Sequence, residues 1–203
     1  MTIFNKFHAL CFGFLVFAIV GAVGYSVNQG DYFQHQYTFI AVKSLLLFLS
    51  IGYTKWFDMI SFGMLSKKQL LLFIEVFLLT VLVNIGYHTF FSVVSGASAQ
   101  HLEETSRGLS LSFIVSVTVL GPIQEELIFR GLLQGAVFDN SWLGLVLTSS
   151  LFSFMHGPYD VPSFFYYLLG GLLLGFAYKK SQNLWVSTLV HMFYNSLPLL
   201  YYL

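Results

Sequence analysis

Charged side chains are scarce in this sequence. Lysine, arginine, aspartate and glutamate together supply 9% of the 203 residues, whereas they supply about 25% of an ordinary soluble domain. Hydrophobic residues supply 57% of the chain, and the mean hydropathy is +0.76. This composition excludes an ordinary soluble domain and predicts a polytopic membrane protein. The aromatic content of 19% suits lipid contact and interfacial belts.

Two further shortages narrow the range of functions. Cys11 is the only cysteine, so no disulfide can form within the chain. Nine basic and nine acidic residues give a net charge of zero, so electrostatics predicts no nucleic-acid partner. The hydrophobic segment after Lys6 lacks a small-residue cleavage pattern, and we interpret it as a retained span rather than a signal peptide.

The hydrophobic segments predict an all-α transmembrane helical bundle of about six to seven spans, because each span needs about 20 residues. We expect one membrane domain over residues 1–203, with no internal repeat. A polar linker is expected at 95–108, and a kink or restart at Gly121-Pro122 because proline disrupts a helix interior. The expected spans are 7–27, 37–53, 69–94, 109–139, 142–156, 162–178 and 184–201.

Basic residues in the connecting segments predict an orientation. With seven spans and the amino terminus inside, Arg107 is the one basic residue of the outer loops. The inner loops then contain Lys6, Lys55, Lys67, Lys68, Lys179 and Lys180. This bias predicts a cytoplasmic amino terminus, and it depends on the span count.

The densest group of charges lies inside an apolar segment, at Glu125, Glu126 and Arg130. Ionisable groups at membrane depth are costly and mark functional sites by default. Glu126 and Arg130 are four apart and share a helix face, so they can pair. Glu125 is rotated by about 100° from Glu126 and is left to face a cavity and take a proton. The competing interpretation is an interhelical salt bridge without chemistry.

Two histidine motifs follow in later hydrophobic segments. Phe152 precedes His156 by four residues, as His191 precedes Asn195. Taken alone, His156 is also typical of an interfacial residue, and Phe152 of core packing. A face with His191 and Asn195 can stabilise an oxyanion, orient water or bind a metal, or it can simply hydrogen-bond between helices.

The rise per residue of an α-helix predicts which of these residues can lie close together. Glu125 lies fourteen residues before Asp139 and His156 seventeen after it. At 1.5 Å per residue both lie about 21 to 26 Å from that turn, so antiparallel spans place them side by side. His191 and Asn195 lie only about 12 and 18 Å from the Lys179-Lys180 side. The last span must therefore be tilted, displaced or begin earlier.

Together the three motifs resemble those of the CPBP family of intramembrane proteases. This family includes the CAAX prenyl endopeptidase and bacterial relatives tied to bacteriocin self-immunity and peptide processing. Its pattern is Glu-Glu-x-x-x-Arg, Phe-x-x-x-His and His-x-x-x-Asn or Asp, which this sequence matches in order between about residues 110 and 200. The resemblance implies an endopeptidase with a catalytic core at 110–200.

The resemblance also implies roles for individual residues. Glu125 and His156 would activate water, and His191 and Asn195 would stabilise the oxyanion. Glu126, Arg130 and Phe152 would support the site. No cofactor is expected because the spacing is not that of an H-E-x-x-H zinc helix. Zinc is the alternative, and its ligands would then be Glu125, His156 and His191.

Two other functions are compatible with the sequence. One is a non-catalytic membrane protein of the same fold that binds a peptide or a partner membrane protein, in bacteriocin immunity or signalling. The other is a small transporter whose polar pathway is formed by Lys43, Glu75 and His88. For the protease, the expected partners are the lipid bilayer and a peptide or membrane-protein substrate, in a bacterial cytoplasmic membrane.

Overall fold

The protein is a bundle of helices. The computed structural model describes residues 3–28, 32–60 and 62–201, and these residues form helices without a β-strand. The predicted all-α membrane bundle is confirmed. The long helices are α1 (Ile3–Asn28), α2 (Tyr32–Trp56), α3 (Lys67–Phe90), α7 (Trp142–Met155), α8 (Val161–Ser181) and α9 (Leu184–Ser196), and a short helix α4 spans Gly96–Ser106.

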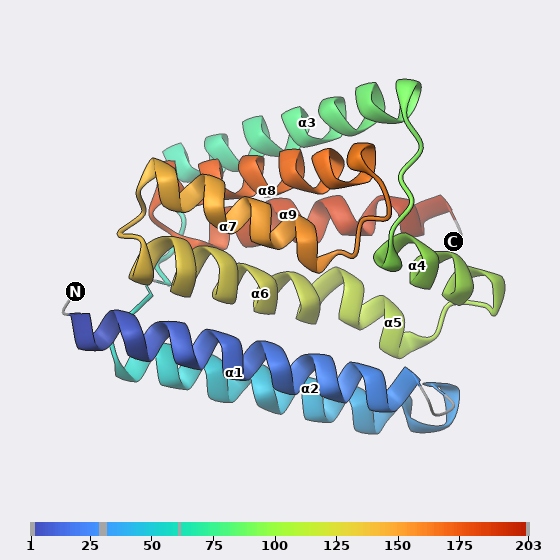
Figure 1. Ribbon diagram of the computed structural model, residues 1–203, viewed down its shortest axis with the longest axis horizontal. Helices are drawn as coiled ribbons and strands as arrows, with labels where there is room; N and C mark the ends of the chain where they lie inside the picture. Colours follow the sequence, from blue (N-terminus) through green and yellow to red (C-terminus); the bar gives the residue numbers. More distant parts are fainter. Residues whose placement is uncertain (1–2, 29–31, 61, 202–203) are drawn as a thin grey trace.

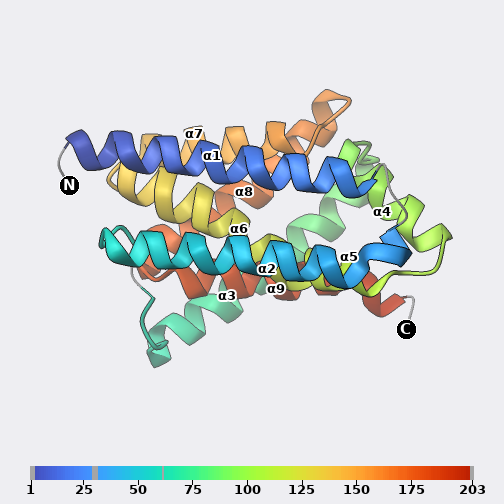
Figure 2. The same ribbon diagram turned by 90° about the horizontal axis from the view of Figure 1, so that it is seen from below.

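The helices run roughly along one axis and form layers (Figure 1). Helices α1 and α2 lie on one side of the bundle and α3 and α8 on the other, with α6 and α7 between them. The view from below shows α1 and α2 side by side over the rest of the bundle (Figure 2). Helix α7 packs against α8, and α3 packs against both α8 and α9. Helix α4 lies at the end of the bundle where the chain terminates (Figure 1).

Four helices of the described residues are long and apolar enough to cross a membrane. They are Gln36–Trp56, Lys67–Phe90, Leu111–Val137 and Val161–Ser181. Phe4–Val16 and Trp142–Met155 are shorter apolar helices. Large apolar side chains such as Leu78 and Leu82 are exposed on the outer face of α3, as expected of a lipid-facing surface.

The expected interruption at Gly121-Pro122 is a local widening of one helix. Residues 111–137 run through α5 (Leu111–Val115), the π-helical η1 (Ser116–Leu120), α6 (Gly121–Glu126) and the π-helical η2 (Leu127–Val137). The Gly121 amide donates to Ser116 five residues back. A Cβ on Gly121 would lie 2.6 Å from that carbonyl oxygen, so glycine lets the wide turn close. Pro122, in the first turn of α6, has no amide to lose.

One predicted boundary is wrong, and one predicted linker is helical. The polar segment 95–108 connects two candidate spans, as expected, and α4 occupies most of it. A capping box between Ser95 and Ser98 starts α4 by satisfying two free backbone amides. The last span was expected to continue to residue 201, but α9 ends at Ser196 and a 3₁₀ turn follows from Pro198. Proline disfavours a helical conformation in the residue before it, which accounts for the early end.

Candidate active site

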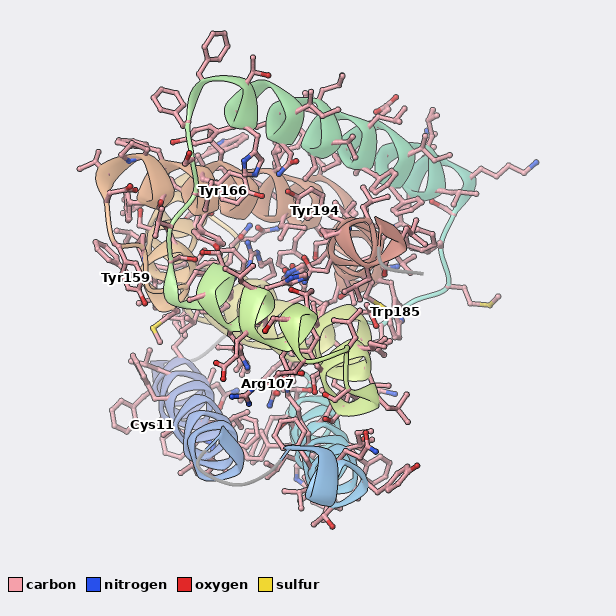
Figure 3. The ribbon with its side chains drawn as sticks, turned by 90° about the vertical axis from the view of Figure 1, so that its right-hand side faces the viewer. Cys11, Arg107, Tyr159, Tyr166, Trp185 and Tyr194 are labelled. Atoms are coloured by element: carbon pink, nitrogen blue, oxygen red, sulfur yellow. The ribbon has the colours of Figure 1, made fainter. Side chains whose placement is uncertain are left out.

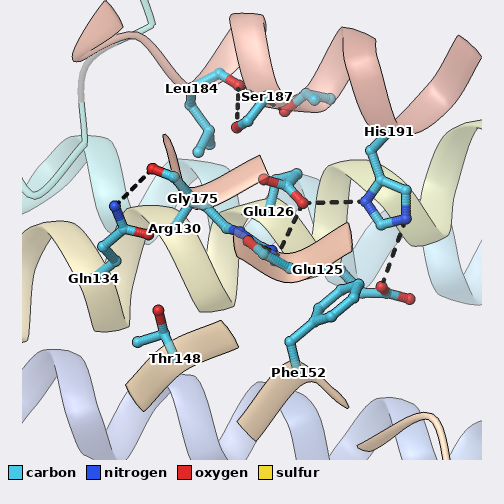
Figure 4. Close-up of polar contacts among 12 residues, drawn as sticks. Glu125, Glu126, Arg130, Gln134, Thr148, Phe152, Gly175, Leu184, Ser187 and His191 are labelled. Carbon is cyan, nitrogen blue, oxygen red and sulfur yellow. Dashed lines mark hydrogen bonds and ion pairs between the residues drawn. The ribbon is translucent and has the colours of Figure 1, made fainter. Parts of the chain in front are cut away.

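Two adjacent glutamates on α6 point to different places, as their 100° separation predicts. Glu126 is fully buried, and its Oε1 lies 3.3 Å from Arg130 Nη1. Arg130 is equally buried, and its Nη2 donates to the Gly171 carbonyl of α8 at 3.0 Å. Glu126 Oε1 also lies 3.1 Å from His191 Nδ1 (Figure 4). The Glu126–Arg130 pair therefore ties α6 and η2 to α8 and α9.

Glu125 lies beside two histidines. Its Oε2 lies 4.0 Å from His156 Nε2 and 3.9 Å from His191 Nε2. That oxygen is buried and has no hydrogen-bond partner among the described residues, although the side chain as a whole is 37% exposed. The distances exceed those of a hydrogen bond, so the three polar atoms face a common space.

The contacts of His156 and His191 indicate which nitrogen of each imidazole ring carries the proton. His156 Nδ1 lies 2.8 Å from the Phe152 carbonyl oxygen, and His191 Nδ1 lies 3.1 Å from the Glu126 carboxylate. Both oxygens can only accept, so each Nδ1 is assigned a proton. In the neutral rings, each Nε2 then presents a lone pair to Glu125. Three acceptors that face one space fit a small group that donates hydrogen bonds, such as water.

Aromatic rings fix the orientation of His156. Phe152 lies 4.3 Å from the His156 ring and Tyr167 of α8 lies 4.4 Å from it, between ring centroids. The Tyr167 hydroxyl is 2.7 Å from Ser95 Oγ, at the start of α4. Arg130 Cζ lies 4.5 Å from the centroid of Phe152. The sequence indicated Phe152 through its motif, but no spacing pointed to Tyr167 or Ser95.

The depth mismatch expected for His191 is absent because α9 is displaced along its axis. Leu184, the first residue of α9, is fully buried in one cluster with Leu127 and Leu132. That cluster also includes Ala136, so the first residue of α9 lies beside η2. His191 Nε2 lies 3.9 Å from Glu125 Oε2, which puts His191 and Glu125 at the same depth.

Asn195 completes the set of predicted residues one turn beyond His191. Its Nδ2 donates to the Val117 carbonyl in η1 at 3.1 Å. The π-helical turn that Gly121 permits lies in this same segment. Both Asn195 and His191 line the same cavity as Glu125 and His156. The structure thus brings the four candidate catalytic residues to one wall.

That cavity has a volume of about 970 Å³ and lies between α2, α3, α4, α8 and α9. Across it, Asn84 of α3 donates to the hydroxyls of Tyr166 and Tyr194, which point inward from α8 and α9 (Figure 3). Lys43 and His88 also line the cavity. Glu75, by contrast, is exposed on α3 and is not among the lining residues. The three residues of the transporter hypothesis therefore do not share one pathway.

A carboxylate and two imidazoles that lie close together are also the ligand types of a zinc centre. Within the described ranges, no three histidine, cysteine, aspartate or glutamate side chains are placed to hold a metal ion. Glu125, His156 and His191 have the right chemistry for zinc, but their facing atoms are 3.9 and 4.0 Å apart.

Comparison with known proteins finds a similar family. A family profile described as type II CAAX prenyl endopeptidase Rce1-like matches residues 107–197, which include all three motifs. This part of the chain therefore resembles the CPBP family. The match begins at the residue after α4 and ends at the residue after α9. The family segment thus contains all four residues of the cavity wall.

Two bacterial proteins are similar to this chain. The chain is 27% identical over 126 residues to "Putative membrane peptidase YdiL" of Bacillus subtilis (strain 168), covering 61% of this chain and 50% of YdiL. It is 26% identical over 171 residues to "UPF0177 protein YbdJ" of Lactococcus lactis subsp. lactis (strain IL1403), covering 79% of this chain and 74% of YbdJ.

A second Lactococcus lactis relative, "UPF0177 protein YvdC" of the same strain, is 27% identical over 129 residues. That match covers 63% of this chain and 49% of YvdC. The chain thus spans about half the length of YdiL and of YvdC. No solved structure matches the chain significantly.

Proposed function

We propose that this protein is an intramembrane endopeptidase that hydrolyses a peptide bond with water activated by Glu125 and His156. One observation carries the proposal. Glu125 Oε2 and the Nε2 atoms of His156 and His191 face one space within 4.0 Å of the carboxylate oxygen. All three side chains line a cavity of about 970 Å³. The match of residues 107–197 to a CAAX prenyl endopeptidase profile supports the same reaction class.

The proposed reaction begins with a water molecule held between Glu125 and His156. The water oxygen attacks the carbonyl carbon of the scissile peptide bond, and its proton passes to the Glu125 carboxylate. Glu125 then donates that proton to the leaving nitrogen as the carbon–nitrogen bond breaks. The products are one new carboxyl group and one new amine, so atoms and charge balance. Such general acid–base catalysis contributes about 10²- to 10⁴-fold to the rate.

His191 and Asn195 are proposed to stabilise the oxyanion of the tetrahedral intermediate. Asn195 uses one amide hydrogen on the Val117 carbonyl, which leaves the second for the substrate. His191 acts as a donor when both its nitrogens carry protons, one directed to Glu126 and one to the oxyanion. Each donor of this kind is worth about 10²- to 10³-fold in kcat.

Glu126 and Arg130 are proposed to position the site rather than react. They hold His191 and α8 through buried contacts at 3.1 and 3.0 Å. Removal of one partner of a buried ion pair leaves an uncompensated charge, so each of the two residues keeps the other in place. A fixed Glu126 keeps the His191 ring in one orientation, which is the role of the aspartate in a Ser-His-Asp triad.

We propose that catalysis is independent of metal ions. What supports this is the spacing of the motifs, which is not that of an H-E-x-x-H zinc helix. The test is cleavage by purified protein after dialysis against a chelator, with metal content measured by mass spectrometry. Unchanged activity supports the proposal. Loss of activity that zinc restores would contradict it and would assign Glu125, His156 and His191 as ligands.

The proposed substrates are membrane-associated peptides or membrane proteins of a bacterial cytoplasmic membrane. The chain is an integral membrane protein by its apolar helices, and its three relatives named above are bacterial. A peptide pheromone or a bacteriocin-related peptide would meet these conditions without a prenyl group.

The experiment that tests the function compares peptides cleaved by wild-type protein and by Glu125→Gln and His156→Ala variants. Purified proteins in proteoliposomes are incubated with a library of synthetic lipid-anchored peptides, and products are identified by mass spectrometry. Glu75→Gln is the matched control, because this acid is also at membrane depth but does not line the cavity.

Cleavage by the wild-type and Glu75→Gln proteins, with a loss of about 10²-fold or more in the other two, supports the proposal. Cleavage at the wild-type rate by Glu125→Gln would contradict it. Complementation of a deletion strain by Glu125→Gln would favour the non-catalytic binding function instead.

A further inference from the structure

Lys43 is a cation inside the membrane that lines the candidate active site. It lies in α2, within the span Gln36–Trp56. Seven residues separate it from Gln36 and thirteen from Trp56, which place it about 10 and 20 Å from the two ends. Its side chain lines the same cavity as Glu125 and His156. Charges at this depth that face a cavity mark pathways or binding sites.

The contacts of Lys43 do not neutralise it. Its Nζ lies 5.4 Å from the centre of the Phe39 ring, and its charge interacts at longer range with Glu125. No carboxylate oxygen of the described residues lies within 4.0 Å of Lys43. The buried Arg130, in contrast, has both Glu126 and a carbonyl oxygen as partners. Among the described residues, Lys43 is therefore a cation that lines the cavity and keeps donors for a ligand.

The charges around the cavity indicate what that ligand is. Glu126 and Arg130 compensate each other behind the cavity wall, which leaves Glu125 and Lys43 as the opposite charges that face the substrate. An anionic group that enters this cavity is repelled by Glu125. It can bind close to the reacting carboxylate only if a cation offsets that repulsion, and an ammonium binds a carboxylate through charge-assisted hydrogen bonds.

We propose that Lys43 binds a carboxylate of the substrate close to the cleaved bond, and so determines substrate specificity. This inference rests on the proposed peptidase function and deepens it. The carboxylate has two sources in a peptide, namely the free carboxyl terminus of a short leaving segment or an acidic side chain beside the cleaved bond. Both present the same group to Nζ, and matched peptides distinguish them.

The experiment measures kcat/KM in phosphatidylcholine proteoliposomes, where no anionic lipid competes for Lys43. One pair of synthetic peptides differs only in a free carboxylate or a carboxamide at the carboxyl terminus. A second pair differs only in Glu or Gln beside the cleaved bond. The proteins are wild type, Lys43→Met, Lys43→Arg and the control Lys55→Met, whose lysine lies on the same helix but is exposed and outside the cavity.

We expect the wild type and Lys55→Met to prefer the acidic member of one pair by about 10- to 100-fold, the range of a charge-assisted hydrogen bond. Lys43→Met loses that preference mainly through a higher KM, because the contact persists from bound substrate to transition state. Lys43→Arg keeps it. The pair that responds identifies the source of the carboxylate.

Equal slowing of both members of each pair in Lys43→Met would overturn the inference, since Lys43 would then act on Glu125 alone. Peptide binding is also measured with proteins that carry His156→Ala. This measurement separates failure of the carboxylate site from failure of the proposed function. A binding preference for the acidic peptide that depends on Lys43, without cleavage by the wild type, would overturn the peptidase and leave the carboxylate site. Cleavage without any such preference would overturn the carboxylate site alone.

Discussion

Tyr167 stacks on His156, with ring centroids 4.4 Å apart and planes inclined by 26°. The Tyr167 hydroxyl reaches Ser95 Oγ at 2.7 Å. The backbone next to Ser95 is also tied to the histidine turn, because the Gly96 amide donates to Gly157 and the Ala97 amide to His156. The start of α4 and the proposed water-activating histidine are therefore parts of one assembly.

The first prediction concerns the Tyr167 ring. Tyr167→Ala removes a face of the His156 pocket and lets the imidazole turn away from Glu125. Aromatic stacking is worth about 0.5–1.5 kcal/mol, so we expect kcat to fall by about 2- to 10-fold. Tyr167→Phe keeps the ring and should retain most of the activity. Cleavage kinetics of the two variants provide the measurement.

Ser95→Ala removes the same hydrogen bond from the other side, together with the cap of α4. It should therefore be no more active than Tyr167→Phe. If Tyr167→Phe were as slow as Tyr167→Ala, the hydroxyl rather than the stacked ring would position His156.

Much of the site could be predicted from the sequence, because many of its contacts join residues within one helix or in two helices connected by a short turn. The divergence of Glu125 from Glu126, and the pairing of Glu126 with Arg130, follow from helix geometry alone. The approach of His156 to Glu125 needs only an antiparallel pair of helices joined at a short turn. These are the relationships that periodicity determines.

Two of the remaining features depend on packing between distant segments, and one depends on an unusual local turn. Leu184 at the start of α9 is buried in one cluster with Leu127 and Leu132, and no spacing in the sequence gives that position. The π-helical turn at Gly121 depends on a carbonyl within the same helix, where the proline indicated only a break. Tyr167 lies in an apolar span rich in aromatics, so its stacking on His156 has no local signal.

The second prediction concerns the buried Glu126–Arg130 pair. Arg130→Met leaves Glu126 as a buried carboxylate without its guanidinium, which costs about 3–5 kcal/mol of folding free energy. The double variant Glu126→Gln/Arg130→Met should recover part of this loss, because no unpaired charge remains. Chemical unfolding in mixed micelles gives the comparison.

Arg107→Met is the matched control for that experiment. Arg107 pairs with Glu103 at 2.8 Å, but both side chains are more than half exposed, so we expect a change of about 0.5 kcal/mol or less. A double variant less stable than Arg130→Met would contradict the prediction and would show that Glu126 is held chiefly by His191.

The third prediction compares two adjacent glycines of α8. A Cβ on Gly171 would lie 3.1–3.2 Å from the Cα, Cβ and carbonyl oxygen of Ser149 in α7, whereas a Cβ on Gly170 would meet nothing within 4 Å. Gly171→Ala should therefore destabilise the protein by about 1–3 kcal/mol, as overpacking does. Gly170→Ala should be neutral or more stable by up to about 1 kcal/mol, the helix propensity gained.

Unfolding of the two glycine variants under the same conditions decides this prediction. Gly171 also supplies the carbonyl that Arg130 binds at 3.0 Å, so Gly171→Ala should lower activity as well as stability. Equal stability of the two variants would mean that α7 and α8 can separate slightly without cost.

The fourth prediction concerns pH and α4. His101 lies edge-on to Phe113 at 5.3 Å, and its Nε2 is buried without a hydrogen-bond partner among the described residues. Burial lowers the pKa of His101 below its usual value. A lowered pKa means that the docked helix binds fewer protons than the undocked one. The stabilisation is complete above a pH of about 6.5, the pKa of a free histidine, and is lost as the pH falls below it.

We therefore expect the amides of residues 96–106 to exchange faster with deuterium at a pH of about 5 than at neutral pH, after correction for the intrinsic rate. Helix α8 is the internal reference and should not respond. His101→Phe keeps the ring contact with Phe113 but cannot bind a proton, so it should abolish the response. An unchanged response in His101→Phe would contradict the assignment of the response to His101.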